Sequence, residues 1–137
     1  MNEWDRWRQK LRHRYCLITP CTIRHDFRRH SCGPSRFATV ELLFEPSSAL
    51  VFSRECEWPA HLTSSETRDL DAAIAAGIHD ALQPSEGAPY DALGVMARCV
   101  LVQWDDVGSS EAAFYAAAWC ATRELRERGQ WQLKELG

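Results

Sequence analysis

The sequence lacks any long hydrophobic run. Of its 137 residues, the longest uninterrupted apolar stretch is residues 112–121, which is ten residues long. A membrane-spanning helix needs about 20 apolar residues. The first residues also lack the basic and then apolar pattern of a secretory signal. These two absences predict a protein without a membrane span and with a cytoplasmic location.

Glycine and proline are scarce, with seven and six residues respectively. This scarcity excludes a collagen-like or low-complexity chain, because both are rich in these residue types. Hydrophobic residues make up 45% of the chain, which is enough to form a buried core. Since a domain usually has about 100–200 residues, we expect one globular domain with at most a short appendage.

The six cysteines include no Cys-x-x-Cys pair. Without a secretory signal a disulfide framework is not expected, so we predict reduced thiols. One group has the residue types that zinc prefers, namely Cys16, Cys21, His25, His30 and Cys32. Its spacing matches no regular zinc site, and half-buried thiols with surface imidazoles are the favoured interpretation. We therefore predict neither a metal nor another cofactor.

Basic residues are few in most of the chain. Residues 37–137 have seven basic against 16 acidic residues, whereas residues 1–36 have nine basic against three acidic residues. The net charge of −3 therefore hides a basic first quarter and an acidic remainder. A concentration of positive charge of this kind is typical of a surface that binds polyanions.

Hydrophobic periodicity and turn residues predict a mixture of helices and strands. We expect helices at 2–14, 63–82 and 112–128, and strands at 15–27, 37–44, 49–57 and 94–104. The first of these strands is expected at an edge of the sheet and with a break at Pro20. The short linker at 45–48 predicts that the strands on either side of it pair as an antiparallel hairpin. The two longer helices and the strands predict an α+β fold, with both helices on one face of a mostly antiparallel four-stranded sheet. Residues 2–14 add a short N-terminal helical segment.

Capping residues mark the ends of the two longer helices. Thr63 and Glu66 have the spacing of a capping box. Ser109 or Ser110 is placed to cap the second helix, and Gly129 is placed to end it. These signals make the two helices the best-defined elements of the predicted fold.

A basic turn lies between the strands predicted at 15–27 and 37–44. The residues that we expect to contact RNA are Arg28, Arg29, His30, Ser31, Gly33 and Arg36. A guanidinium group matches the geometry of a phosphate, and an imidazole ring can stack on an unpaired base. The turn is therefore the predicted RNA-binding site.

Five short segments also occur in the order and spacing of a known family. They are Arg-His-Ser-Cys-Gly-Pro-Ser-Arg at 29–36, Phe-Glu-Pro at 44–46, Ala-Ala-Gly-Ile at 75–78, Gly-Ala-Pro at 87–89 and Val-Gly-Ser-Ser-Glu-Ala-Ala-Phe at 107–114. The last segment runs into an alanine-rich helix and is the most specific of the five. Together the segments resemble domain IV of the translocation GTPase elongation factor G, over about residues 29–129.

The resemblance implies a left-handed βαβ crossover, and the absence of a GTPase motif predicts a stand-alone copy of this domain. It divides the chain into a basic segment at 1–14, the domain at 15–129 and a C-terminal tail at 130–137. In the family, the tip loop before the second helix carries a histidine that reaches toward the decoding region of the ribosome. Here Trp104, Asp105 and Asp106 occupy that loop, so an acid replaces a base. The sequence has no Gly-x-x-x-x-Gly-Lys-Ser/Thr loop, so we expect no GTP binding.

We expect a non-enzymatic module of translation that binds structured RNA or the ribosome. The basic turn and the resemblance both favour this function. Asp105, Asp106 and the acidic remainder favour the alternative, a protein-interaction module or homodimer that keeps the fold and has lost contact with RNA. No motif places a cysteine nucleophile and a histidine base beside an orienting group, so we do not expect an enzyme.

Overall fold

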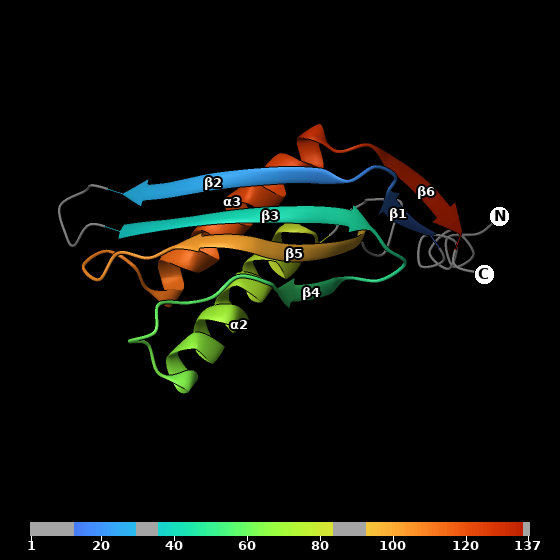
Figure 1. The fold of residues 1–137 in the computed structure, drawn as a ribbon. Coiled ribbons are helices and arrows are strands. Elements are labelled where there is room, and N and C mark those ends of the chain that lie inside the picture. The colour runs from blue at the N-terminus through green and yellow to red at the C-terminus, as the bar shows by residue number, and fades with distance from the viewer. Residues whose placement is uncertain (1–12, 30–35, 84–92, 136–137) are drawn as a thin grey trace, which may run out of the picture.

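The computed structural model describes residues 13–29, 36–83 and 93–135. These residues form an α+β fold, as predicted, with two helices and a mixed sheet. Figure 1 shows both helices on the same face of the sheet. The elements in chain order are β1 (His13–Leu17), β2 (Cys21–Arg29), β3 (Arg36–Pro46), β4 (Val51–Arg54), α2 (Ser64–Ala81), β5 (Leu93–Gln103), α3 (Glu111–Arg128) and β6 (Trp131–Glu135).

The sheet has six strands rather than the predicted four. Neighbouring strands follow the order β2-β3-β5-β1-β6, and β4 pairs with β5 outside this path. The break predicted at Pro20 is confirmed, and it divides the strand predicted at 15–27 into β1 and β2. A sixth strand, β6, follows α3 and pairs antiparallel with β1. A strand of five residues is too short to show a periodic hydrophobic pattern, so β6 could be recognised only from its pairing with β1 in the structure.

The predicted N-terminal helix falls mainly outside the described residues. Its last two positions, His13 and Arg14, lie in β1, which is a strand and not a helix. The remainder of that prediction, residues 2–12, is not covered by the structure. β1 is held on both sides, since it pairs in parallel with β5 and antiparallel with β6.

β3 and β4 do not form the predicted hairpin. β5 lies between them and pairs antiparallel with β3 and parallel with β4. The linker that follows Pro46 therefore carries the chain from one side of β5 to the other. A linker of this length is typical of a hairpin, so the local sequence could not reveal the crossing. As a result, β4, α2 and β5 form a βαβ unit, and its second strand, β5, lies between β3 and β4 in the sheet.

Both predicted helices are present, and their caps are confirmed. The Thr63 side chain accepts a hydrogen bond from the Glu66 backbone, and the Glu66 side chain accepts one from the Thr63 backbone. Of the two serines before α3, it is Ser110 that caps the helix, through a 3.2 Å bond from the Ala113 N–H. In the described part of the chain, neither helix has the length and apolar character that would let it cross a membrane.

The core lies between the sheet and the two helices. Its largest fully buried side chains are Phe44, Phe114, Leu17, Ile23, Leu42, Ile74, Ile78 and Leu125. The helices lie in close contact at Gly77, where an added Cβ would lie 2.5 Å from the Tyr115 carbonyl oxygen. A side chain at this position would therefore force the helices apart. This close packing fixes the position of α3, and the first turn of α3 supports the tip loop that precedes it.

Candidate nucleic-acid interface

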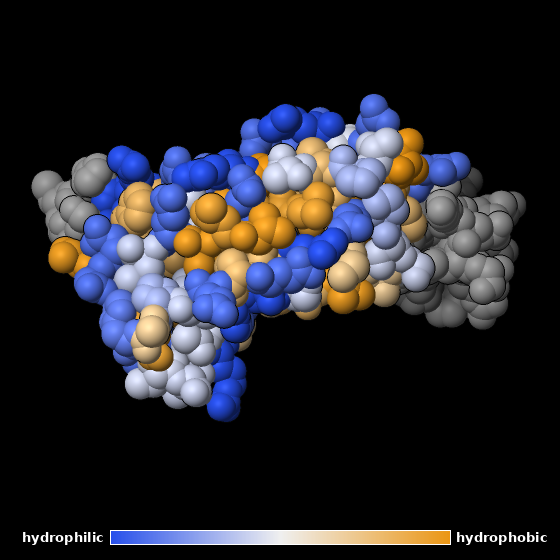
Figure 2. Space-filling model, in the orientation of Figure 1, coloured by the Kyte–Doolittle hydropathy of each residue, from blue (hydrophilic) through white to orange (hydrophobic). Residues whose placement is uncertain are grey.

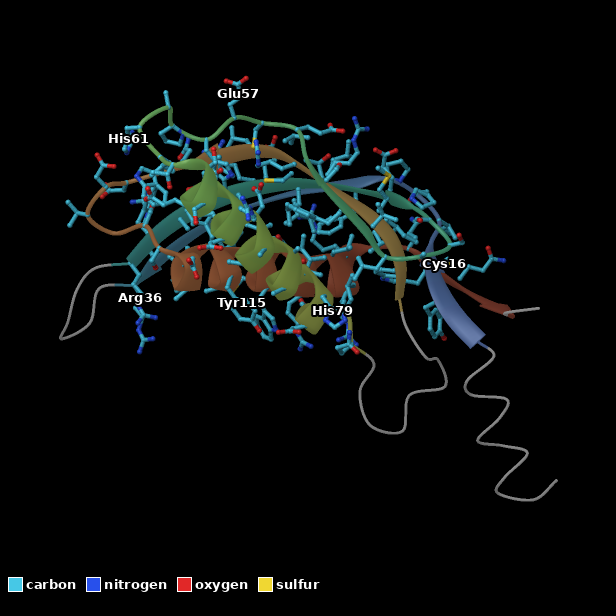
Figure 3. All side chains as sticks on the ribbon, turned by 90° about the horizontal axis from the view of Figure 1, so that it is seen from below. Cys16, Arg36, Glu57, His61, His79 and Tyr115 are labelled. Atoms are coloured by element: carbon cyan, nitrogen blue, oxygen red, sulfur yellow. The ribbon has the colours of Figure 1, made fainter. Side chains whose placement is uncertain are left out.

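Arginines gather where β2 ends and β3 begins. The antiparallel register places Arg29 directly opposite Arg36, next to the pair formed by Arg28 and Phe37. Arg36 extends away from the ribbon at this end of the sheet (Figure 3). The structure therefore brings together the three arginines of the predicted site. The other predicted contacts lie outside the described residues, namely His30, Ser31 and Gly33.

Arg29 and Arg36 form a pair of like charges. Directly opposed like charges destabilise a pair of strands. Both residues are exposed. Within the described ranges, no carboxylate lies within ion-pair distance of either guanidinium group. An anion bound between the two side chains would relieve this repulsion.

Arg28 is held in place by its neighbours. Its guanidinium carbon lies 5.2 Å from the centroid of the Phe37 ring, within the range of a cation–π contact. On the same strand, Asp26 accepts a 2.7 Å hydrogen bond from the Thr39 hydroxyl. This hydrogen bond, together with the charges of Arg24 and Arg28, lowers the pKa of Asp26. The charge of Arg28 is therefore partly offset within its own strand.

The loop that precedes α3 packs against the start of β3. The Phe37 N–H donates a 2.9 Å hydrogen bond to the Gly108 carbonyl, and the Ser109 hydroxyl donates a 2.7 Å bond to the Phe37 carbonyl. The start of β3 and the loop that contains the tip residues therefore meet at one end of the molecule (Figure 1).

Asp105 organises the backbone of the tip loop. Its Oδ1 atom accepts hydrogen bonds from the Val107 N–H at 2.8 Å and the Gly108 N–H at 3.1 Å. The Asp105 N–H donates to the Ser109 hydroxyl, and the Ser109 N–H donates back to the Asp105 carbonyl. A short acidic side chain that binds the following N–H groups is a common way to stabilise a turn. The carboxylate of Asp105 is therefore used to shape the loop.

Asp106 connects the tip loop to the segment before α2. Its Oδ1 atom accepts a 2.6 Å hydrogen bond from the Trp104 indole and lies 2.9 Å from the His61 Nε2 atom. The indole hydrogen bond, followed by that of His61, lowers the pKa of Asp106. Figure 3 shows His61 at the same end of the molecule as this loop. Sequence analysis gave no role to His61, because its partner lies 45 residues away.

A cluster of three aromatic side chains supports the tip loop, namely Trp58, Trp104 and Phe114. The rings of Trp104 and Phe114 stack with centroids 6.1 Å apart, and Trp58 meets Phe114 edge to face at 5.0 Å. The Trp58 indole donates a 2.8 Å hydrogen bond to Asp71 on α2. Trp58 and Phe114 are both buried. The loop is therefore fixed on a packed base, and its shape is set before any ligand binds.

A shallow pocket of about 180 Å³ lies between the first turns of α2 and α3. Three of its lining residues carry carboxylates, namely Glu66, Asp69 and Glu111. Like charges repel phosphate, so this pocket is a poor site for a nucleic-acid backbone. The arginines at the end of the β2–β3 pair remain the surface best suited to an anion.

No protein-family model matches the chain. A crystal structure of a protein from Thermus thermophilus is similar to it, with a TM-score of 0.71 and 21% sequence identity. The match covers 90% of this chain and 18% of that chain. The chain thus spans less than a fifth of the length of that protein. At this identity the likeness establishes a shared fold and transfers no activity.

Proposed function

We propose that this chain is a non-enzymatic module that binds structured RNA or the ribosome through the end of the β2–β3 pair. Its fold is proposed to be that of domain IV of elongation factor G, with a left-handed β4–α2–β5 crossover. The parallel pairing of β4 with β5, and the position of both helices on one face of the sheet, support this assignment.

The opposed pair of Arg29 and Arg36 carries the functional proposal. Two arginines held across one register position present several N–H donors in fixed planes, which suits bidentate contact with a phosphate. Their mutual repulsion falls when an anion lies between them. Arg28 lies over the Phe37 ring on the opposite face of the sheet, because successive side chains of a strand alternate between faces. The end of the β2–β3 pair thus offers two guanidinium groups on one face and a third on the other.

The neighbouring acids are compatible with this proposal. Asp105 and Asp106 both accept hydrogen bonds from the protein itself. Hydrogen-bond donors from the protein satisfy part of their charge and fix the carboxylates in the loop. We infer that they build the loop and do not repel RNA from the adjacent arginines.

Binding to ribosomes tests the proposal directly. Purified ribosomal subunits are sedimented with the full-length protein at low and high salt, and RNA hairpins are titrated in parallel by fluorescence anisotropy. Phosphate contacts release counter-ions, so binding is expected at low salt and is expected to weaken steeply as salt rises. The absence of binding to both partners at low salt contradicts the proposal. A chain without residues 1–12, which leaves β1 intact, shows whether the basic N-terminal segment contributes.

A second candidate is a protein-interaction module that has kept the fold. Figure 2 shows an apolar strip across the face of the sheet that the helices leave open. Leu43 and Leu101 are only half buried although they lie in β3 and β5, and Val107 at the tip is 88% exposed. Apolar surface of this kind is typical of the core of an interface. Concentration-dependent mass in sedimentation equilibrium, without any RNA binding, favours this candidate.

A further inference from the structure

We propose that Cys56 and Cys99 form a reactive thiol pair that a hydroperoxide oxidises to an intramolecular disulfide. Cys56 follows β4, and Cys99 lies in β5, the central strand of the sheet. Both are free thiols. The proposal requires no contact with RNA, so it stands independently of the function proposed above.

The backbone brings Cys56 into the neighbourhood of Cys99. Arg54, the last residue of β4, is the register partner of Cys99. The next residue, Glu55, donates its N–H to the Cys99 carbonyl at 2.8 Å. This hydrogen bond places Cys56 directly after a residue tied to Cys99. The two thiol groups interact with each other, and this interaction shifts their pKa values in opposite directions.

The two thiols differ in accessibility and in ionisation. Cys56 is partly exposed, whereas Cys99 is fully buried. A hydrogen bond from the Cys99 thiol and the positive charge of Arg54 lower the pKa of Cys56 to about 7, although burial and the Asp71 carboxylate oppose this shift. The same hydrogen bond and burial raise the pKa of Cys99. Cys56 is therefore the nucleophile that solvent reaches, and Cys99 is the buried partner.

Arg54 holds its charge near Cys56 through two contacts. One guanidinium N–H donates to the Cys56 carbonyl oxygen, and the Nε–H donates to Asp71 on α2 at 2.7 Å. A thiolate beside an arginine is a typical environment for a reactive cysteine. At Cys120, by contrast, burial raises the pKa, which makes its thiolate scarcer at neutral pH.

The reaction proceeds in two balanced steps. The Cys56 thiolate attacks one oxygen of the hydroperoxide, so an S–O bond forms, the O–O bond breaks, and the departing alkoxide or hydroxide takes up a proton. Cys99 then attacks the sulfenic sulfur of Cys56, forming the S–S bond, and the proton of its thiol leaves with the hydroxyl group as water. The two thiols lose two electrons, and the hydroperoxide is reduced to an alcohol or water, with a second water formed in the second step.

Peptide mapping of the oxidised protein tests the proposal. Reduced full-length protein is treated with hydrogen peroxide and digested without reductant, and the peptides are identified by mass spectrometry. We expect a linked pair that contains Cys56 and Cys99 as the main product, which dithiothreitol separates. Accumulation of Cys56 sulfinic acid with Cys99 still reduced overturns the proposal, and so does a different cysteine pair as the main product.

Alkylation rates provide a second readout that needs no variant. The rate at Cys56 with iodoacetamide is expected to be half-maximal near pH 7, where the pKa is about 7. At this pH, Cys56 is expected to react roughly fivefold or more faster than Cys120, because a larger thiolate fraction outweighs the lower nucleophilicity of a weaker base. Equal rates at the two cysteines contradict the proposal.

A matched pair of variants separates the two roles. In Cys99→Ser, the second step is blocked, so a 1,3-dione probe is expected to trap Cys56 sulfenic acid in place of the disulfide. In Cys120→Ser, the disulfide is expected to form as in the original protein. Loss of the disulfide in Cys120→Ser, or no sulfenic acid in a folded Cys99→Ser protein, overturns the proposal. If Cys99→Ser does not fold, the peptide map of the unmodified protein decides.

Discussion

Two segments at the same end of the molecule carry opposite charges and use them differently. In the loop after β5, Asp105 and Asp106 accept hydrogen bonds from nearby backbone and side-chain groups. At the end of the β2–β3 pair, Arg29 and Arg36 face each other without a carboxylate partner among the described residues. The sign of a charge in the sequence therefore says less about binding than whether the folded protein already uses that charge.

Removal of the aromatic base of the tip loop is expected to have the largest effect. Phe114→Ala deletes a fully buried ring that contacts both Trp58 and Trp104. We expect the free energy of unfolding to fall by about 3–5 kcal/mol, as measured by urea denaturation. Trp119→Ala is the control, because this side chain is 37% exposed and is expected to cost far less. Equal losses of unfolding free energy in the two variants would show that the buried aromatic cluster stabilises the protein no more than an exposed ring does.

Asp105→Ala tests whether the tip acids are structural. The Val107 and Gly108 N–H groups lose their shared acceptor, so we expect a loss of about 0.5–1.5 kcal/mol in the free energy of unfolding. The exposed Asp69→Ala removes the same charge and is expected to change stability by less than about 0.5 kcal/mol. A gain in RNA affinity in Asp105→Ala without a loss of stability would show that this acid acts by repulsion, against our interpretation.

The smallest expected effect is on the way the free energy of unfolding decreases at acid pH. Hydrogen bonds from Trp104 and His61 lower the pKa of Asp106 in the folded protein. A carboxyl group with a lowered folded pKa contributes stability above its unfolded value, near pH 4, and this contribution is lost as the pH falls through the folded value. Urea midpoints between about pH 3 and pH 6 are therefore expected to fall less steeply with acid in Asp106→Asn than in the unmodified protein. Profiles of equal slope would contradict a role for Asp106 as an acceptor.

The helices could be predicted because their signals are local. The capping box at Thr63 and Glu66 and the serine before α3 lie within a few residues of the turns that they stabilise. The three arginines of the site could be predicted for the same reason, since a high local density of charge is visible in the sequence. The position of Arg29 directly opposite Arg36 could not be predicted, because it depends on the register in which β2 and β3 pair.

Features that depend on distant pairing were missed or predicted wrongly. β4 has the composition of a hairpin strand, yet its partner is β5, on the far side of a helix in the sequence. The neighbourhood of Cys56 and Cys99 follows from that same pairing, so no spacing rule could have found it. The partnership of His61 and Asp106 likewise depends on how the segment before α2 returns to the tip loop. Local patterns define elements, whereas the tertiary fold defines which polar groups meet.

One comparison of charge-matched variants tests the central claim most directly. The first variant replaces Arg28, Arg29 and Arg36 with alanine, and the second replaces three exposed helix arginines, Arg68, Arg123 and Arg128. Both lose the same charge, so long-range attraction of RNA falls equally in the two. Affinity for an RNA hairpin is measured at several salt concentrations.

The account predicts that the first variant binds more weakly and that the slope of log affinity against log salt falls by roughly two to three, since each lost phosphate contact removes about 0.7–0.9. The second variant is expected to keep the slope of the unmodified protein within about one half. Equal slopes in the two variants would contradict the claim that the end of the β2–β3 pair is the RNA-binding surface.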